Sequence, residues 1–278
     1  MAAQGPIIVI KRDGEQVVFD DARVIRSMER SGVPKELHDR ALEHIKERVQ
    51  RDNTITTDEI FYHIREFLTK KDKKSALRFN LRQGIFELGP TGFPFEQYLA
   101  QIFKEQGYTV QTDLQMQGEC VSHEIDLLIQ KEGRREIVEA KFHNQTFGKT
   151  DVHVLLYTYA RYLDVRERNN IDAVWVATNT KLTVDAITYA ECKGIKTLAW
   201  NYPENNNLQD FVERPKMYPI TIMTDLTTEE KRRLINNDVV LAYDLLKIPD
   251  REFENKYMID EKRIVEIKNS AELICNPK

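Results

Sequence analysis

Two short apolar runs open the chain, at residues 7–10 and 17–19, with Asp13-Gly14 between them. An Asp-Gly pair between apolar runs is a strong signal for a tight β-hairpin turn. From residue 21 onward, apolar positions recur every three or four residues, which is typical of amphipathic helices. We expect four helices, beginning at a cap on Asp21, after Pro34, at a cap on Thr57 and near Asp72. The pattern predicts a hairpin followed by helices up to residue 88.

The cluster Gly89-Pro90-Thr91-Gly92 interrupts this pattern, and a different order of elements follows it. A helix is predicted around 95–103, and apolar runs predict strands at 108–114, 125–130 and 136–141. A long helix at 151–166, a strand at 173–177, a helix at 184–192 and a strand at 197–200 complete the series. This alternation predicts a sheet flanked by helices.

For the last part of the chain, the sequence predicts a loop at 201–207 followed by short helices. Thr227-Thr228-Glu229-Glu230 has the composition of a helix start. Two short helices, through Leu234 and across 239–246, suggest an appendage resembling a helix-hairpin-helix. We therefore predict three domains: 1–90, 91–205 and 206–278.

Composition narrows the class of protein. Hydrophobic residues at 41% and charged residues at 31% suit folded domains with real cores. The sequence shows no run of about 18 apolar residues and no signal peptide, so we expect a cytoplasmic protein without a membrane partner. Three scattered cysteines predict ordinary thiols. The net charge of -4, with its acidic excess after residue 90, excludes coating of nucleic acid by bulk charge and leaves room for a local patch.

The candidate catalytic residues lie between residues 123 and 141. Glu139 and Lys141 project from the same side of their strand because side chains alternate faces. If this strand pairs with the preceding one, which ends in Asp126, through a hairpin across Gly133-Arg134-Arg135, Asp126 reaches the same face. Two carboxylates and a lysine suit hydrolysis of a phosphodiester with Mg²⁺, for which Mn²⁺ should substitute.

These residues give residues 93–200 a resemblance to the PD-(D/E)xK nuclease superfamily, especially its type IV restriction endonuclease branch. The resemblance rests on Glu96 in the leading helix, Asp126 in the second strand and Glu139-Ala140-Lys141 in the third. It implies an α/β restriction-endonuclease-like fold with a central mixed sheet. It also implies that Asp126, Glu139 and the Ala140 carbonyl bind the metal, that Lys141 orients the attacking water, and that Glu96 reaches the metal through water. An exposed glutamate is an equal alternative for Glu96.

Polar residues beyond this strand are candidate substrate contacts. His143 and Lys149 follow it directly, and His153, Tyr157 and Arg161 recur at four-residue intervals on one face of a predicted helix. This row resembles the accessory Gln-x-x-x-Tyr element of the type IV branch, with His153 in the place of glutamine. The resemblance implies phosphate contact or support of the active site. A solvated helix face is the alternative.

A second resemblance covers residues 7–90, where Val9-Ile10-Lys11-Arg12-Asp13-Gly14, then Phe19-Asp20 and Arg23, precede four helices. This order resembles the ATP-cone, a regulatory nucleotide-binding α+β module. The resemblance implies that ATP or dATP binds as an allosteric ligand to Lys11, Arg12, Asp20, Arg23 and Thr57. Arginine can bind phosphate oxygens in bidentate fashion. The sequence contains no Walker-type loop, so ATP hydrolysis is not implied.

These features lead to one principal hypothesis. The chain is expected to be a Mg²⁺-dependent endonuclease that cuts DNA under the control of ATP or dATP, in restriction or anti-phage defence, and to work as a homo-oligomer. Two alternatives stay open from the residues: a nucleotide-responsive DNA-binding regulator that no longer cuts, and a nuclease directed at RNA.

Overall fold

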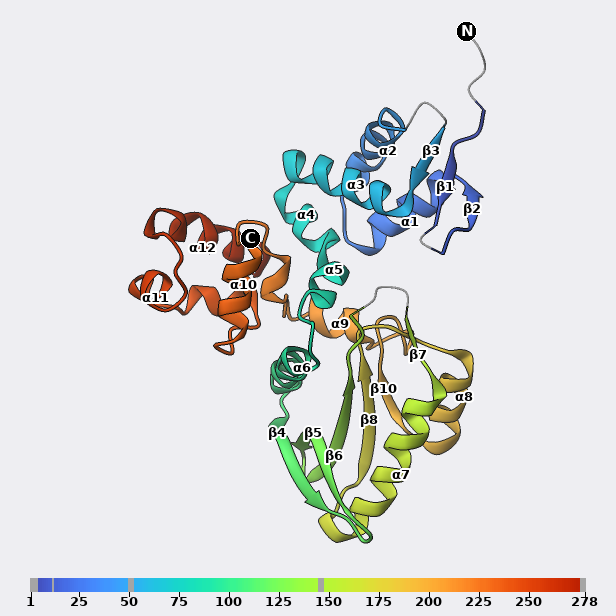
Figure 1. Ribbon diagram of the computed structural model, residues 1–278, viewed down its shortest axis with the longest axis vertical. Coiled ribbons are helices and arrows are strands. Elements are labelled where there is room, and N and C mark those ends of the chain that lie inside the picture. Colours follow the sequence, from blue (N-terminus) through green and yellow to red (C-terminus); the bar gives the residue numbers. More distant parts are fainter. Residues whose placement is uncertain (1–4, 12, 50–52, 145–147, 276–278) are drawn as a thin grey trace. The chain divides into compact units, whose positions relative to one another are not determined.

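The computed structural model describes residues 5–11, 13–49, 53–144 and 148–275 of the 278 (Figure 1). The chain divides into two compact units, Met1–Arg82 and Gln83–Lys278, called here the N-terminal and C-terminal units. This division falls inside one helix, α5 (Leu81–Phe86), a few residues before the boundary that the sequence predicts after residue 90. The three-domain partition stays a prediction.

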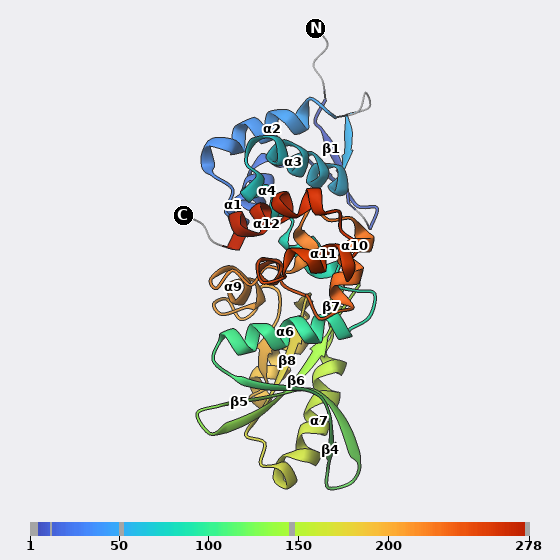
Figure 2. The ribbon, with the colours of Figure 1, turned by 90° about the vertical axis from the view of Figure 1, so that its left-hand side faces the viewer.

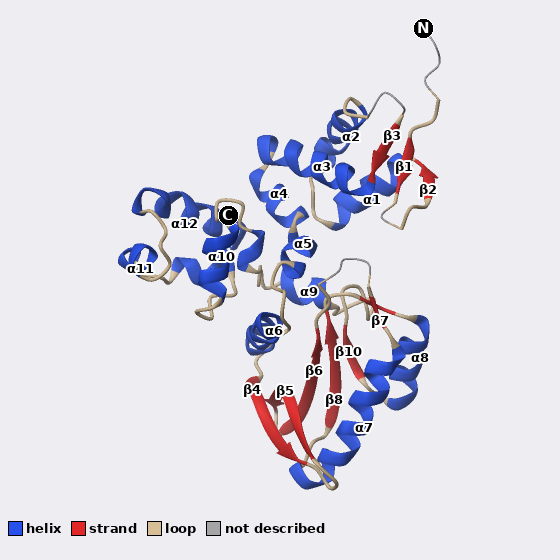
Figure 3. Cartoon of the chain, viewed as in Figure 1, coloured by secondary structure: helices blue, strands red, loops and turns tan. Residues whose placement is uncertain are grey.

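The N-terminal unit contains the predicted hairpin and one strand that the sequence did not reveal. Strands β1 (Ile8–Ile10) and β2 (Gln16–Val18) pair antiparallel, and Gly14 in the turn has a φ of 86°. Strand β3 (Thr54–Thr56) pairs parallel to β1 and completes a three-stranded sheet (Figure 3). Three residues are too few to show a periodicity, so this strand depends on its long-range partner.

The helices of this unit are α1 (Asp21–Arg30), η1 (Lys35–Leu37), α2 (His38–Lys46), α3 (Thr57–Lys71) and α4 (Lys73–Phe79). The predicted caps are each wrong by one residue. Asp20 caps α1 by accepting from the backbone of Ala22 and Arg23, and Thr56 caps α3 in a capping box with Glu59. The capping residue is still extended, so it precedes the first helical residue.

The single helix predicted near 72–88 is divided into two. It breaks at Asn80 into α4 and α5, whose bounds are given above. The core of the N-terminal unit is formed by apolar residues from the sheet and helices α1 to α4: Val9, Val24, Met28, Leu42, Ile45, Ile55, Ile64, Leu68 and Ala76.

The C-terminal unit contains a five-stranded sheet in the order β10-β8-β6-β5-β4. Its strands are β4 (Thr109–Gln117), β5 (Ser122–Lys131), β6 (Arg134–Lys141), β8 (Ala173–Thr178) and β10 (Lys196–Leu198). The first three are antiparallel, and β6, β8 and β10 are parallel. The prediction of a mixed sheet flanked by helices is confirmed. The β5–β6 turn is narrower than predicted, since Lys131 pairs with Arg134 and only Glu132 and Gly133 lie between them.

Helices cover both faces of this sheet. Helix α6 (Phe93–Glu105) lies on one face, and α7 (Val152–Asn169) and α8 (Val184–Lys193) lie on the other (Figures 1 and 2). On the α6 face, Phe103 packs edge-on against Trp175. On the α7 face, Leu155, Ile137 and Val176 belong to one buried cluster. Apolar side chains on both faces of the sheet are therefore buried beneath helices.

The remaining elements are β7 (Lys149–Thr150), β9 (Lys181–Leu182), α9 (Leu208–Glu213), η2 (Ile220–Ile222), α10 (Thr228–Ile235), η3 (Ala242–Leu246), α11 (Asp250–Asn255) and α12 (Glu261–Cys275). The predicted helix start at Thr227 is present as a capping box with Glu230. The predicted pair of short helices is not formed by two α-helices, because residues 242–246 form the 3-10 segment η3. Within the described residues, no helix has the length and apolarity to cross a bilayer.

Candidate active site

Asp126 lies in the middle of β5, at the place where this strand stops pairing with β6. The sequence placed it at a strand end. The ladder between the strands ends at Leu127 and Val138, and the Ala140 N–H donates to the Asp126 Oδ2 at 2.6 Å. Beyond this point β6 continues by pairing with β8. The Asp126 carboxylate thus replaces a backbone partner and is held directly beside Glu139 and Lys141.

The pairing of β5 with its other neighbour, β4, is also interrupted at Asp126. Strand β4 pairs Thr112 with Leu127 and Leu114 with Ile125, and Asp113 between them has a φ of 54°. Aspartate is one of the few residues that adopts the left-handed region readily. Both neighbouring ladders are therefore interrupted around Asp126, whose side chain is half-buried at the end of the β6 pairing. The sequence did not single out Asp113.

Glu139 is paired with an arginine from the helix on its face. The Arg161 Nη1 donates to the Glu139 Oε2, and the two side chains are only 13% and 18% exposed. The guanidinium of Arg161 also lies over the Tyr157 ring, 4.8 Å from its centroid. Of the three residues predicted to share one face of α7, Arg161 therefore contacts the candidate site through Glu139, and Tyr157 contacts Arg161.

The carboxylates around Asp126 outnumber the positively charged side chains that neutralise them. Burial, and then the neighbouring Asp126 carboxylate, raise the pKa of Glu139, while Arg161 and Lys141 oppose the rise. Burial also raises the pKa of Asp126. The pKa of Glu96 is raised to about 7 by burial and by the carboxylates of Asp126 and other acidic neighbours. Glu96 therefore shares the electrostatic environment of Asp126 and Glu139, and its contact with a metal through water stays a prediction.

This donor set fits a hydrated divalent cation. Asp126 uses its Oδ2 for the Ala140 N–H, and Glu139 uses its Oε2 for Arg161, so each carboxylate has a second oxygen available. Mg²⁺ keeps several waters and needs only one or two protein carboxylates. A cation would also offset the burial, and the repulsion between carboxylates, that raise these pKa values. The residues that would hold it are Asp126, Glu139 and the carbonyl of Ala140.

We predict that Glu96→Gln stabilises the protein at pH 8 but not at pH 4.5. The folded pKa of about 7 lies above the ordinary value of 4.5, so protonated Glu96 favours the folded state. That stability is fully present below pH 4.5 and is lost as the pH rises through 7. Glutamine mimics the protonated form. The free energy of unfolding of Glu96→Gln at pH 8 should therefore exceed that of the wild type by about 2 kcal/mol after solvent screening.

The measurement is urea denaturation in EDTA at both pH values. It is followed by the fluorescence of Trp175 and Trp200, the two tryptophans of the chain, both in the C-terminal unit. Glu105→Gln, an exposed carboxylate at the far end of the same helix, is the control and should change little. A Glu96→Gln gain of equal size at the two pH values would contradict the electrostatic explanation.

His143 is held by a residue that sequence reasoning missed. Asn179 is fully buried, accepts the His143 N–H at 2.9 Å and donates to the His143 carbonyl at 2.7 Å. The His143 Nε2 also lies 3.0 Å from the Thr150 hydroxyl, which meets Thr178 and Thr180 in a buried cluster. Asn179 follows β8, and the carboxyl ends of parallel strands meet at one edge of a sheet. That position was the signal in the sequence.

Two predicted substrate contacts lie apart from these interactions. The His153 Nδ1 pairs with the Asp151 carboxylate at 2.6 Å, and its side chain is 87% exposed. Lys149 lies exposed in β7. His153 does not join Tyr157 and Arg161 around Glu139, because its imidazole pairs with Asp151, the residue that caps α7. The roles of His153 and Lys149 in substrate binding stay predictions.

The predicted nucleotide contacts in the N-terminal unit are described only in part. Lys11 pairs with Glu15 across the hairpin, and the Asp20 carboxylate caps α1. Arg23 is exposed on α1, and Thr57 is the first residue of α3. Arg12 lies outside the described residues. The pairing of Lys11 with Glu15 means that a phosphate would compete with a carboxylate for this lysine.

Comparison with known proteins identifies two regions of the chain. Residues 90–201 match the restriction endonuclease family model, and residues 218–275 match the model described as AF1548-like, C-terminal. The crystal structure of AF1548, a protein of unknown function, is 30% identical with a TM-score of 0.58, and the match covers 68% of this chain and all of that one. This chain belongs to the AF1548-like family. A relative from Archaeoglobus fulgidus is 36% identical to this AF1548-like protein over 148 residues, which are 53% of the chain and 83% of the relative.

Two cyanobacterial relatives of this AF1548-like protein carry a different name. The transcriptional repressor NrdR of Microcystis aeruginosa is 30% identical over 88 residues, and that of Synechocystis is 27% identical over 115 residues. These matches cover 30% and 38% of the chain, and 52% and 71% of the repressors. The AF1548-like protein thus spans about half of the first repressor. The restriction endonuclease match supports a nuclease and agrees with the site around Asp126.

Proposed function

We propose that this AF1548-like protein is a Mg²⁺-dependent endonuclease that cuts DNA. The observation that supports this most directly is the Asp126 carboxylate bonded to the Ala140 N–H, beside Glu139 and Lys141, at the point where β5 and β6 separate. It brings the Asp and Glu-x-Lys groups of a restriction-endonuclease-like domain together in space. The match of residues 90–201 to the restriction endonuclease family supports the same conclusion.

Each residue has a distinct task in this proposal. Bound Mg²⁺ would neutralise charge that develops on the phosphate and activate water for attack. Asp126 and Glu139 supply the oxygens that bind the cation, and Ala140 fixes the orientation of Asp126. Lys141 orients the attacking water, and Arg161 holds the Glu139 carboxylate in place. The raised pKa of Glu96 makes it a carrier for a proton near neutral pH.

The experiment is cleavage of supercoiled plasmid by the full chain with Mg²⁺, with Mn²⁺ or with EDTA. We expect nicked or linear products with either metal and none with EDTA. Single-stranded RNA, tested in parallel, distinguishes a nuclease directed at RNA, and methylated plasmid tests a role in restriction or anti-phage defence. Cleavage that persists in EDTA would contradict the metal-dependent mechanism.

We further propose that the N-terminal unit is an ATP-cone that controls cleavage through bound ATP or dATP. Lys11 lies on the β1–β2 hairpin and Arg23 on the adjoining helix α1, the positions that the ATP-cone resemblance assigns to phosphate. The similarity to NrdR repressors supports a regulatory role. A nucleotide regulates only if it binds two states unequally, typically by about 1–3 kcal/mol. A change of homo-oligomeric state is the device we favour, because cutting both strands of a duplex is simplest with two sites.

Lys11→Ala is predicted to weaken binding of ATP and dATP at least about tenfold, because a charge-assisted phosphate contact is lost. Calorimetric titration of the full chain measures the affinity. Lys35→Ala, an exposed lysine of the same unit in η1, is the control and should bind as the wild type does. Undiminished affinity in Lys11→Ala combined with Arg12→Ala would contradict the ATP-cone assignment.

The NrdR similarity also favours a second candidate function. The chain would then be a nucleotide-responsive regulator that binds DNA and does not cut it. The regulator predicts DNA binding that needs no metal and intact plasmid in every nucleotide state. The endonuclease predicts products that depend on the metal, so the same plasmid assay separates the two.

A further inference from the structure

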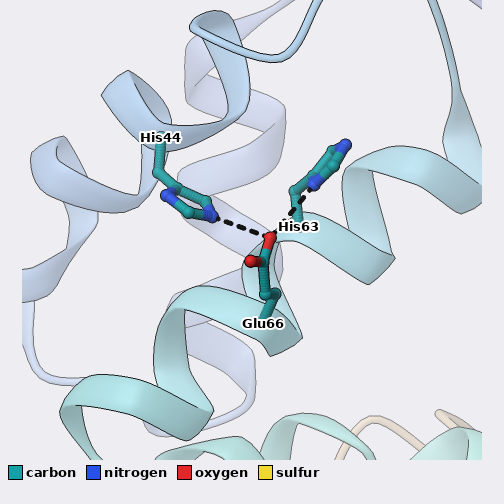
Figure 4. Close-up of side chains that lie close together, drawn as sticks. All are labelled: His44, His63 and Glu66. Atoms are coloured by element: carbon teal, nitrogen blue, oxygen red, sulfur yellow. Dashed lines mark hydrogen bonds and ion pairs between the residues drawn. The ribbon is translucent and has the colours of Figure 1, made fainter.

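A second group of possible metal ligands lies within the N-terminal unit, on two of its helices. Helix α2 contributes His44, and α3 contributes His63 and Glu66, which are three residues apart and so share a face (Figure 4). Among the residues that the structure describes, this is the group of three His, Cys, Asp or Glu side chains whose ligand atoms all lie within 4.8 Å of one another. Sequence reasoning did not single them out.

The distances in this group match those of a small tetrahedral metal site. The His44 Nε2 lies 3.2 Å from the Glu66 Oε2, and the His63 Nδ1 lies 3.5 Å from the same oxygen. Zn²⁺ binds nitrogen and oxygen at about 2.0–2.2 Å, so two ligands of a tetrahedron lie roughly 3.3–3.5 Å apart. Two of the three distances between ligand atoms are already close to this length, and the third, between the two histidines, is within 4.8 Å.

Burial favours a ligand over a solvated cluster. The side chains of His44 and His63 are 15% and 16% exposed, and that of Glu66 is 25% exposed. The His63 Nδ1 is buried and has no hydrogen-bond partner among the described residues, although it faces Glu66. A buried polar atom without a partner costs free energy. Coordination of a cation would satisfy it.

Two cations already contact the residues of the cluster. The Arg48 Nη1 lies 2.9 Å from the His44 Nδ1, and the Lys70 Nζ lies 2.7 Å from the Glu66 Oε1. Arginine can only donate, so the His44 Nδ1 accepts and its ring proton sits on Nε2, which donates to Glu66. Hydrogen bonds from Lys70 and then His44 lower the pKa of Glu66 to about 2. Glu66 is therefore an anionic ligand at neutral pH.

We propose that His44 Nε2, His63 Nδ1 and a Glu66 carboxylate oxygen form a Zn²⁺ site, with water as the fourth ligand. When the metal binds, the His44 proton moves from Nε2 to Nδ1, and Arg48 turns away from Nδ1 and from Glu66. Lys70 stays on the outer carboxylate oxygen and orients it, as partners of metal ligands commonly do. The bound metal connects α2 to α3 directly.

The site is tested by equilibrium dialysis of the full chain against Zn²⁺ and by the visible absorption of Co²⁺ as a substitute. The Asp126→Ala variant is used throughout, so that metal at the candidate active site does not contribute. We expect one equivalent of Zn²⁺ and Co²⁺ bands of a tetrahedral site. A thiolate-to-cobalt band would assign the metal to the exposed Cys120 or Cys192 and overturn the proposal.

Removal of a ligand identifies the site. His63→Ala and Glu66→Gln should each weaken Zn²⁺ binding by at least about a hundredfold, since even partners of ligands contribute about 10- to 100-fold. His153→Ala, which removes an exposed histidine of the other unit, is the control and should bind as before. Glu66→Gln keeps the shape of the side chain, and circular dichroism reports whether each variant is folded. One equivalent retained by both ligand variants would overturn the proposal.

Arg48→Gln is a variant that should strengthen Zn²⁺ binding, whereas the ligand variants should weaken it. It removes the cation that lies 3.3 Å from the Glu66 Oε2, so we expect Zn²⁺ binding to tighten by roughly tenfold or more. Weaker binding in this variant would show that Arg48 supports the cluster and does not compete with a metal. That result, or no measurable Zn²⁺ binding by the chain, would overturn the proposal and leave Arg48 and Lys70 as the permanent counter-ions of Glu66.

Discussion

Asp126→Asn is expected to reduce plasmid cleavage by about 10²–10³-fold, the size of effect seen when one group that stabilises transition-state charge is removed. The substitution removes a negative charge that would bind the cation. It preserves the shape of the side chain, and the asparagine oxygen can still accept the Ala140 N–H. The fold should therefore remain while the activity is lost. Initial rates with Mg²⁺, corrected for protein concentration, measure the change.

A control for this variant lies at the other end of the same hairpin. Glu132→Gln removes an exposed carboxylate in the β5–β6 turn and should leave cleavage unchanged. Both variants should give the circular dichroism spectrum of the wild type. If Asp126→Asn cut plasmid at the wild-type rate, Asp126 would have no part in the chemistry, and the endonuclease proposal would lose the observation on which it depends.

Arg161→Met is expected to lower the free energy of unfolding by about 2–4 kcal/mol in EDTA, because it leaves the mostly buried Glu139 carboxylate without its partner. Added Mg²⁺ should restore part of this loss, since a divalent cation near Glu139 would supply the missing positive charge. Urea denaturation followed by tryptophan fluorescence, with and without Mg²⁺, measures both effects. The comparison detects metal at the site without relying on cleavage.

Two further variants separate charge from packing. Arg161→Met combined with Glu139→Gln removes both charges and should be more stable in EDTA than Arg161→Met alone, with no response to Mg²⁺ through Glu139. Arg166→Met removes a more exposed arginine of the same helix, paired with its neighbour Glu167, and should cost little. An equal loss in the single and double variants would mean that Arg161 stabilises the helix by packing alone.

The order of elements could be predicted from the sequence because it depends on local patterns. The β1–β2 hairpin follows from Asp13-Gly14 between two apolar runs, and the main helices and strands between residues 93 and 200 follow from their periodicity. The shared face of Glu139 and Lys141 follows from the alternation of a strand. The errors are mostly at element ends: the caps at Asp20 and Thr56, the break at Asn80 and the 3-10 segment at 242–246.

The candidate site combines both kinds of information. The residue types Asp126, Glu139 and Lys141 were recognisable because their spacing on two strands matches a known family pattern. The helix carrying Glu96 was also recognisable, but its pKa of about 7 depends on carboxylates brought to it by the sheet. The hydrogen bonds of Asn179 to His143 join residues 36 positions apart, so the place of Asn179 after a parallel strand could indicate a functional residue but not its partner.

The sequence by itself determined most of the secondary structure and the acidic and basic residues of the candidate site, because each is encoded within a strand or a helix, and the resemblance to a family implied the mixed sheet. Only the tertiary structure decided which of these groups touch: Asp126 with Ala140, Glu139 with Arg161, and His44 with Glu66. The physical reason is that periodicity fixes which face a side chain occupies, whereas its partner on another element is chosen by packing between segments far apart in the chain.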